Sequence, residues 1–200
     1  RVDQQRGLIA LGLFKDYEDI RTSPRQEFGT VQPGDIKYKD VNGDGIINDG
    51  DKVAIGATTR PNLIYGIGAS LGWKNFDFNF HFQGAGKSTF PINGKNVFAF
   101  SENDWGNVMV GLLDDRWVDA ETAEKLGITA NENPNAAYPR LSYGKNENNQ
   151  QSSSFWLRDG RYFRLKNVDL GYTLPKSVTN KYHFNEIRLF FTASNLLSWS

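Results

Sequence analysis

The strongest feature of the chain is a strict alternation of apolar and polar positions between residues 62 and 83. Its second half sets four phenylalanines against polar neighbours, so that Phe76, Phe78, Phe80 and Phe82 alternate with Asp77, Asn79, His81 and Gln83. Its first half has apolar residues at Leu63, Tyr65, Ile67, Ala69, Leu71 and Trp73. A repeat of two residues is the period of a β-strand, and the short connection Lys74-Asn75 suits a tight turn. The pattern predicts a β-hairpin with one apolar face and one polar face.

Two more alternating stretches follow near the end of the printed sequence. The first runs from Phe155 to about Leu174, and its apolar positions include Val168 and Leu170. The second runs over Glu186–Ser194, after a turn-rich segment at 175–184. We expect these stretches to form two further strands of the same kind.

The long segment 84–154 has no comparable strand pattern. It predicts a single short helix, in which Asp119 is the N-cap, Ala120–Leu126 the body and Gly127 the stop. A second helical turn is expected near Asp16–Ile20. Because irregular segments of this length are uncommon in compact domains, the pattern indicates that 84–154 is a functional loop.

Two architectures explain the alternating strands. A soluble β-sandwich buries one face of each strand and leaves the other in water. A membrane β-barrel turns the apolar face to lipid and the polar face to an aqueous interior, and runs of about 10 residues match the ~25 Å apolar band of such barrels. Aromatic residues near the strand ends (Tyr65, Trp73, Tyr172 and Trp199) suit the interfaces of a membrane. The pattern alone leaves both architectures open.

Composition and charge exclude several classes of protein. The chain has 23 basic and 23 acidic residues, and this balance argues against binding to nucleic acid, which needs a basic surface. It has no cysteine, which excludes disulfides, thiolate metal sites and cysteine nucleophiles. No run approaches the ~18 apolar residues that a membrane-spanning helix requires.

Residues 40–51 match the spacing of a calcium-binding loop. Oxygen donors occupy the first, third, fifth and ninth positions, a glycine stands at the sixth, and a carboxylate closes the loop at the twelfth. The loop closes with an aspartate instead of the usual glutamate, and the alternative to metal binding is a turn held by its own side chains. We expect a structural Ca²⁺ site whose ligands are Asp40, Asn42, Asp44, the Ile46 carbonyl, Asn48 and Asp51.

Catalytic chemistry is not indicated. His81 and His183 are isolated in the sequence, and no Ser-His-Asp combination can be assembled. The segment Gly-Ala-Gly-Lys-Ser at 84–88 lacks the first glycine of a phosphate-binding loop at position 81. We therefore predict no catalytic residues and no enzyme activity.

Several stretches together resemble the SusC/RagA-type TonB-dependent transporters of bacterial outer membranes, in their C-terminal portion. Ser154–Asn167, with the sequence Ser-Phe-Trp-Leu-Arg-Asp-Gly-Arg-Tyr-Phe-Arg-Leu-Lys-Asn, is the most specific of them. The other matching stretches are Leu11–Phe14, Gly34–Gly45, Ile64–Gly68, Phe76–Phe78, Tyr138–Leu141, Leu170–Pro175 and Thr192–Leu197. They occur in the family's order and cover most of the chain.

The resemblance implies an all-β fold, in which antiparallel strands form part of a large transmembrane β-barrel with long extracellular loops. It implies a multi-pass protein of the outer membrane that imports glycans or peptides. The partners it implies are a SusD-like surface lipoprotein, TonB acting through an N-terminal part absent from residues 1–200, and the lipid of the outer membrane. A handful of strands cannot close such a barrel, so the chain is expected to be a segment of one.

Successive strands of a barrel cross the membrane in opposite directions, so their connections alternate between the two sides of the membrane. If the turn at Lys74-Asn75 is periplasmic, the calcium-like loop at 40–51 and the segment 84–154 lie outside the cell. Trp105, Trp117 and Tyr138 in that segment are residue types that stack on sugars, although they can equally pack the loop or contact the surface lipoprotein. We assign no substrate-binding residue. The rival hypothesis is a soluble, calcium-stabilised β-module that binds carbohydrate or protein.

Overall fold

The computed structural model describes residues 3–94, 97–100 and 108–200. The chain forms two compact units. One, here called the sheet unit, consists of Thr58–Thr89 and Asp159–Ser200. The other, the loop unit, consists of Arg1–Ala57 and Phe90–Arg158.

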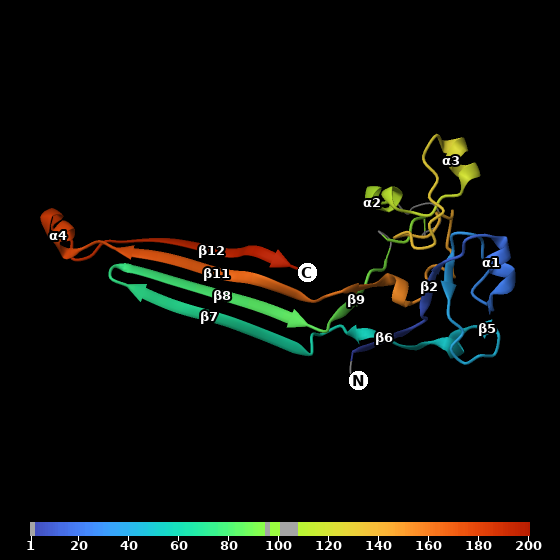
Figure 1. The fold of residues 1–200 in the computed structure, drawn as a ribbon, viewed down its shortest axis with the longest axis horizontal. Coiled ribbons are helices and arrows are strands. Elements are labelled where there is room, and N and C mark those ends of the chain that lie inside the picture. The colour runs from blue at the N-terminus through green and yellow to red at the C-terminus, as the bar shows by residue number, and fades with distance from the viewer. Residues whose placement is uncertain (1–2, 95–96, 101–107) are drawn as a thin grey trace. The chain divides into compact units, whose positions relative to one another are not determined.

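The sheet unit is a four-stranded antiparallel sheet with the order β12-β11-β8-β7 (Figure 1). Its strands are β7 (Leu63–Trp73), β8 (Phe76–Gly86), β11 (Tyr162–Thr173) and β12 (Arg188–Trp199). The predicted hairpin is confirmed, since Trp73 pairs with Phe76 and Lys74 in the turn has a positive φ of 52°. The two predicted C-terminal strands are present, although β11 begins at Tyr162 instead of Phe155 and β12 continues beyond Ser194. Strand β8 runs to Gly86, inside the segment expected as loop.

The β7–β8 turn and the β11–β12 connection lie at the same end of the sheet. The Lys74-Asn75 turn joins β7 to β8, while α4 (Lys176–Thr179) and η3 (Asn180–Tyr182) lie between β11 and β12. Asn75 donates a side-chain hydrogen bond to the Thr173 carbonyl (2.6 Å), which ties the turn to the end of β11. We call this the turn end of the sheet, and Figure 1 shows α4 beyond the strands there.

The loop unit contains short strands that pair two by two. These are β1 (Gln4–Gly7) with β6 (Val53–Thr58), β2 (Ala10–Leu13) with β4 (Ile36–Tyr38), and β3 (Arg25–Gln26) with β5 (Ile46–Ile47). Two further short strands, β9 (Thr89–Pro91) and β10 (Leu157–Asp159), pair where the chain passes between the units.

Short helices complete the loop unit, namely α1 (Tyr17–Thr22), α2 (Val110–Asp114), α3 (Ala120–Leu126), η1 (Asp49–Asp51) and η2 (Ser154–Trp156). The helix predicted between Asp119 and Gly127 is confirmed with the expected caps, because Asp119 accepts from the Thr122 N–H and Gly127 adopts the left-handed conformation. The turn predicted near Asp16 is α1, with Asp16 as its N-cap. Among the described residues, no helix is both long and apolar enough to span a membrane.

A hydrophobic core holds the loop unit together. Its buried members are Leu8, Leu13, Ile36, Tyr38, Ile47, Trp117, Ala136 and Trp156. They come from both ends of the unit's sequence, so part of the segment 84–154 packs against the N-terminal strands instead of standing alone as a loop. Burial also raises the pKa of the Tyr38 phenol far above its usual value.

Candidate functional site

The apolar face of the sheet unit is built from residues that stand opposite one another on four strands. Cross-strand partners point to the same side of a sheet, so the pairing register sorts them into rows. The five rows are Trp73/Phe76/Tyr172/Leu189, Leu71/Phe78/Leu170/Phe191, Ala69/Phe80/Val168/Ala193, Ile67/Phe82/Leu165/Leu197 and Tyr65/Gly84/Phe163/Trp199. The four phenylalanines of β8 therefore lie on one face with the apolar residues of their neighbours, as the alternation predicts.

The two outer rows are aromatic. In the row at the turn end, the rings of Phe76 and Tyr172 are 4.5 Å apart. In the row at the other end, Phe163 stacks against Tyr65 (6.2 Å) and Trp199 (5.9 Å). Tyr65 is 44% exposed, Trp73 66% and Trp199 50%, so the rings lie on an open surface. The aromatic residues singled out from the sequence thus fall into two separate bands with aliphatic and phenylalanine rows between them.

The spacing of these bands is that of a membrane-spanning strand. From Tyr65 to Trp73 a strand rises about 26 Å at ~3.3 Å per residue. At the usual tilt this is roughly 20 Å along the membrane normal, most of the ~25 Å apolar band that aromatic girdles flank in outer-membrane barrels. All residues of β7 are exposed, on both faces of the sheet.

The opposite face of the same sheet is polar and rich in glycine. Asp77, Asn79 and His81 of β8 lie there, with their partners Gly72, Ser70 and Gly68 of β7. On β11 the corresponding residues are Gly171, Asp169 and Asn167. Asp77 forms an ion pair with Arg188 of β12 (2.6 Å). This face has the chemistry of a surface in contact with water.

The calcium-like loop is held by hydrogen bonds from its own backbone. The two carboxylate oxygens of Asp40 accept from the N–H groups of Gly43 (2.6 Å) and Gly45 (2.8 Å). Asp44 accepts from the Ile46 N–H (2.8 Å). Among the described residues, no group of three Asp, Glu, His or Cys side chains is placed to hold a metal ion. Each carboxylate oxygen that accepts one N–H still retains a lone pair.

Asp51 closes this loop from a fully buried position. Burial raises its pKa, but the N–H groups of Asn48 (3.0 Å), Val41 (2.8 Å) and Asn42 (3.3 Å) outweigh that effect and hold the pKa of the carboxyl below its usual value. Asp51 is therefore charged and buried, and the described part of the chain gives it no Lys or Arg partner. Asp49 of this loop forms an ion pair with Lys52, and Asp49 lies outside the expected ligand set.

Two of the three aromatic residues singled out in segment 84–154 pack within the loop unit. Trp117 is 4% exposed and belongs to the core of the loop unit. Tyr138 packs against that core. Trp105 lies outside the described residues. The packing interpretation is thus confirmed for the two aromatic residues that the structure places.

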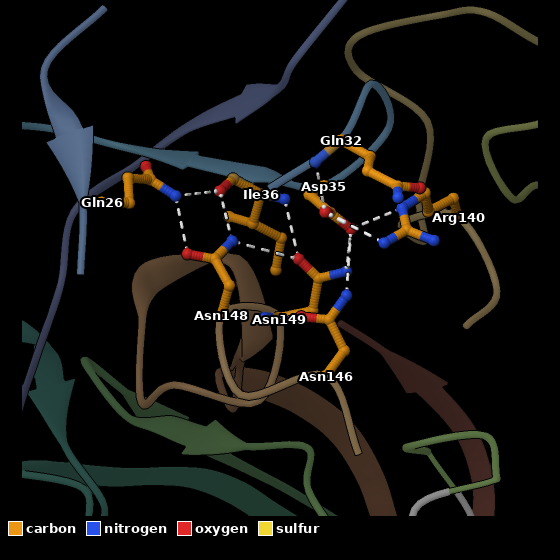
Figure 2. A network of polar contacts seen from close by, with 8 residues as sticks. All are labelled: Gln26, Gln32, Asp35, Ile36, Arg140, Asn146, Asn148 and Asn149. Carbon is orange, nitrogen blue, oxygen red and sulfur yellow. Dashed lines mark hydrogen bonds and ion pairs between the residues drawn. The ribbon is translucent and has the colours of Figure 1, made fainter. Parts of the chain in front are cut away.

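A buried carboxylate, Asp35, organises the segment that follows Tyr138 (Figure 2). Asp35 accepts hydrogen bonds from the side-chain amides of Asn149 (2.8 Å) and Asn146 (3.0 Å) and from the Gln32 N–H (2.8 Å). It also forms an ion pair with Arg140 (2.9 Å). All donors to this carboxylate except Gln32 come from residues more than a hundred positions later.

Neighbouring amides take the place of a strand beside β4. The Ile36 N–H donates to Asn149 (2.9 Å), and the Ile36 carbonyl accepts from Asn148 (2.9 Å) and Gln26 (3.0 Å). The Tyr38 N–H donates to Gln26 (2.7 Å). These side chains satisfy buried backbone groups that would otherwise cost free energy. The run Asn146-Glu-Asn-Asn149 is the only local sign of this network in the sequence, and it does not indicate that its partners lie more than a hundred positions earlier.

Curated proteins with similar sequences are receptors. The chain is 32% identical over 195 residues to "TonB-dependent receptor P26" of Formosa agariphila. This alignment covers 97% of the chain and 18% of that protein. It is 28% identical over 172 residues to "TonB-dependent receptor P3" of the same organism, covering 86% of the chain and 15% of that protein. No protein-family model matches the chain. None of these relatives is an enzyme by name, in agreement with the sequence prediction.

Solved structures give the same fold. The RagAB peptide transporter matches with a TM-score of 0.65 and 16% identity, and the RagAB peptide importer in its "open-open" state matches with a TM-score of 0.62. Each match covers 98% of this chain and 19% of the other. The chain thus spans about a fifth of the length of the proteins it matches. Because the sequence relationship runs over nearly the whole chain and the fold agrees, the chain belongs to the TonB-dependent receptor family.

Proposed function

We propose that the protein containing this chain imports a nutrient across the outer membrane in a TonB-dependent manner. The sheet unit supplies late strands of the barrel wall, with the apolar rows toward lipid and the polar face toward the interior. The observation that carries this role is the pair of aromatic rows at the two ends of one apolar face. The family relationship supports it independently.

The nutrient we propose is a glycan or a peptide, taken up together with a SusD-like lipoprotein. Support comes from the family resemblance and from two structural neighbours, the RagAB peptide importer and the RagAB peptide transporter. The calcium-like loop and the segment 84–154 from Phe90 onward belong to the loop unit, which we place on the extracellular side. TonB would act through a part of the protein outside residues 1–200.

Fractionation of the full-length parent protein tests the membrane assignment. We expect it in the outer-membrane fraction, with a band that shifts on boiling as a folded barrel unfolds. Recovery from the soluble fraction without such a shift would instead support the rival calcium-stabilised β-module. Growth of a deletion strain on single glycans or peptides, with complementation, then identifies the nutrient class.

We also propose that the loop at 40–51 binds one structural Ca²⁺. The spacing of its donors supports this, and so does the buried charge of Asp51, since buried charges in proteins are normally paired or coordinate a cation. Asp40, Asn42, Asp44, the Ile46 carbonyl, Asn48 and Asp51 would hold the ion. Bound calcium would neutralise the carboxylates and stiffen the loop.

The test compares two exposed aspartates of the same loop. Asp44→Asn removes a proposed ligand charge but keeps an oxygen that can accept from the Ile46 N–H. Asp49→Asn changes a carboxylate outside the ligand set. We expect millimolar calcium to raise the melting temperature of the parent protein and of Asp49→Asn, and to do so much less for Asp44→Asn. Equal responses in all three proteins would exclude the site.

A further inference from the structure

We propose that the turn end of the sheet unit binds the phosphate groups of anionic phospholipid in the periplasmic leaflet. This inference rests on the proposed membrane placement and adds a specific lipid-binding surface to it. The surface consists of Trp73, Lys74, Lys176, Lys181 and Tyr182.

The first observation is a lysine fixed beside the aromatic row. Lys74 follows Trp73 directly and has a φ of 52°, the left-handed conformation of the tight turn. Its ammonium group lies 4.6 Å from the centre of the Trp73 ring. Since Trp73 is 66% exposed and belongs to the outer aromatic row, Lys74 stands just beyond the apolar face, at the level where lipid head groups begin.

The second observation is a further set of cations on the connection between β11 and β12. Lys181 lies 6.0 Å from the ring centre of Tyr182, which is 61% exposed. Lys176 donates to the Asn185 carbonyl (2.6 Å), so its ammonium is also held close to this connection. The hydrogen bonds between Asn75 and Thr173 keep the connection and the Lys74 turn at the same end of the sheet.

The charges of these lysines are not neutralised within the chain. The ion pairs of the sheet unit include Asp159–Arg161 and Asp77–Arg188, and within the described residues none joins Lys74, Lys176 or Lys181 to a carboxylate. At the boundary between the acyl chains and the head groups of a bilayer, aromatic rings lie in the interface and lysines bind the lipid phosphates. The exposed rings and unpaired ammonium groups at the turn end match this boundary. An anionic lipid surface therefore complements this end in both polarity and charge.

The experiment measures lipid preference with the full-length parent protein in nanodiscs. One set contains phosphatidylcholine alone and the other includes phosphatidylglycerol, and native mass spectrometry counts the lipid that stays bound. Because a lysine near an anionic surface contributes about fivefold in affinity, Lys74→Gln with Lys181→Gln should weaken phosphatidylglycerol retention roughly 25-fold. Lys125→Gln with Lys145→Gln, two exposed lysines of the loop unit, is the matched control and should retain the preference.

The outcomes separate this inference from the proposed function. Unchanged phosphatidylglycerol retention in the Lys74/Lys181 variant overturns the lipid site while leaving the transporter assignment intact. Competition by inorganic phosphate at the same lysines overturns the lipid source and indicates a free-phosphate site. A parent protein that does not enter nanodiscs contradicts the membrane assignment itself.

Discussion

Asp77 of β8 and Arg188 of β12 form a two-point ion pair across the intervening strand β11. The Arg188 guanidinium donates to both carboxylate oxygens, at 2.6 and 3.3 Å. The pair passes directly over Gly171, where a Cβ atom would collide with both partners. The glycine at this position of β11 therefore leaves the space in which the side chains of Asp77 and Arg188 meet on the polar face.

Gly171→Ala should separate this ion pair and destabilise the sheet. Overpacking of this kind typically costs about 1–3 kcal/mol, more than an exposed ion pair contributes alone. Heat modifiability of the parent protein should show a lower unfolding temperature. The matched control is Gly72→Ala, on the same face and in the same cross-strand row, where a Cβ atom meets nothing within 4 Å. Equal effects of the two substitutions would refute the steric explanation.

A charge on the apolar face should be costly in the membrane. Phe80 lies in the middle row, so Phe80→Arg should lower the free energy of unfolding by roughly 2–4 kcal/mol. Its neighbour Asn79 lies on the polar face, and Asn79→Arg should be mild. Unfolding titrations in lipid vesicles give both values. Similar losses at the two positions would mean that both faces are packed, as in a sandwich.

Gly84 provides the space in which the Tyr65 ring lies. An added Cβ atom at Gly84 would overlap that ring, whereas one at Gly86 would make an ordinary contact with Leu63. Gly84→Ala should therefore destabilise the barrel by about 1–3 kcal/mol, and Gly86→Ala should have little effect. Adding Tyr65→Ala should make the Gly84 substitution harmless. A double variant in which the two losses simply add would argue against this contact.

Asp35 should be the most sensitive polar residue of the loop unit. Asp35→Ala leaves Arg140, Asn146 and Asn149 without their acceptor, and breaking a buried ion pair in this way costs about 3–5 kcal/mol. Limited proteolysis should then cut within residues 141–151, which the parent protein protects. Glu147→Gln, in the same segment, removes only an exposed pair with Lys145 and should leave the protection unchanged.

Acid should weaken the loop at 40–51 through Asp51. Its folded-state pKa lies below the unfolded value of about 3.9, so its stabilising contribution is complete above that pH and is lost as the pH falls through the folded pKa. In calcium-free buffer, the parent protein should lose more of its melting temperature below about pH 4 than Asp51→Asn does. Parallel melting curves against pH for the two proteins would contradict this role.

Local patterns in the sequence determined the hairpin, the two faces of its strands and the capped helices. Strand alternation needs only neighbouring residues, and the caps Asp16, Asp119 and Gly127 act within one helical turn of their own position. The spacing of the oxygen-bearing side chains at 40–51 is equally local, although in the structure the carboxylates of Asp40 and Asp44 accept hydrogen bonds from the loop's own backbone. Family membership also followed from stretches of sequence, and the comparisons confirmed it.

Only the tertiary structure decided the features that join distant residues. The aromatic rows depend on the pairing of β7, β8, β11 and β12, including an irregularity between Leu165 and Asn167 that keeps Phe163 and Val168 on the same face although their positions differ in parity. Asp35 meets Asn149 across 114 residues, and Trp117 is buried by the N-terminal strands. Such contacts arise from packing and from the satisfaction of buried polar groups, which depend on where the chain returns in space and leave no periodic trace in the sequence.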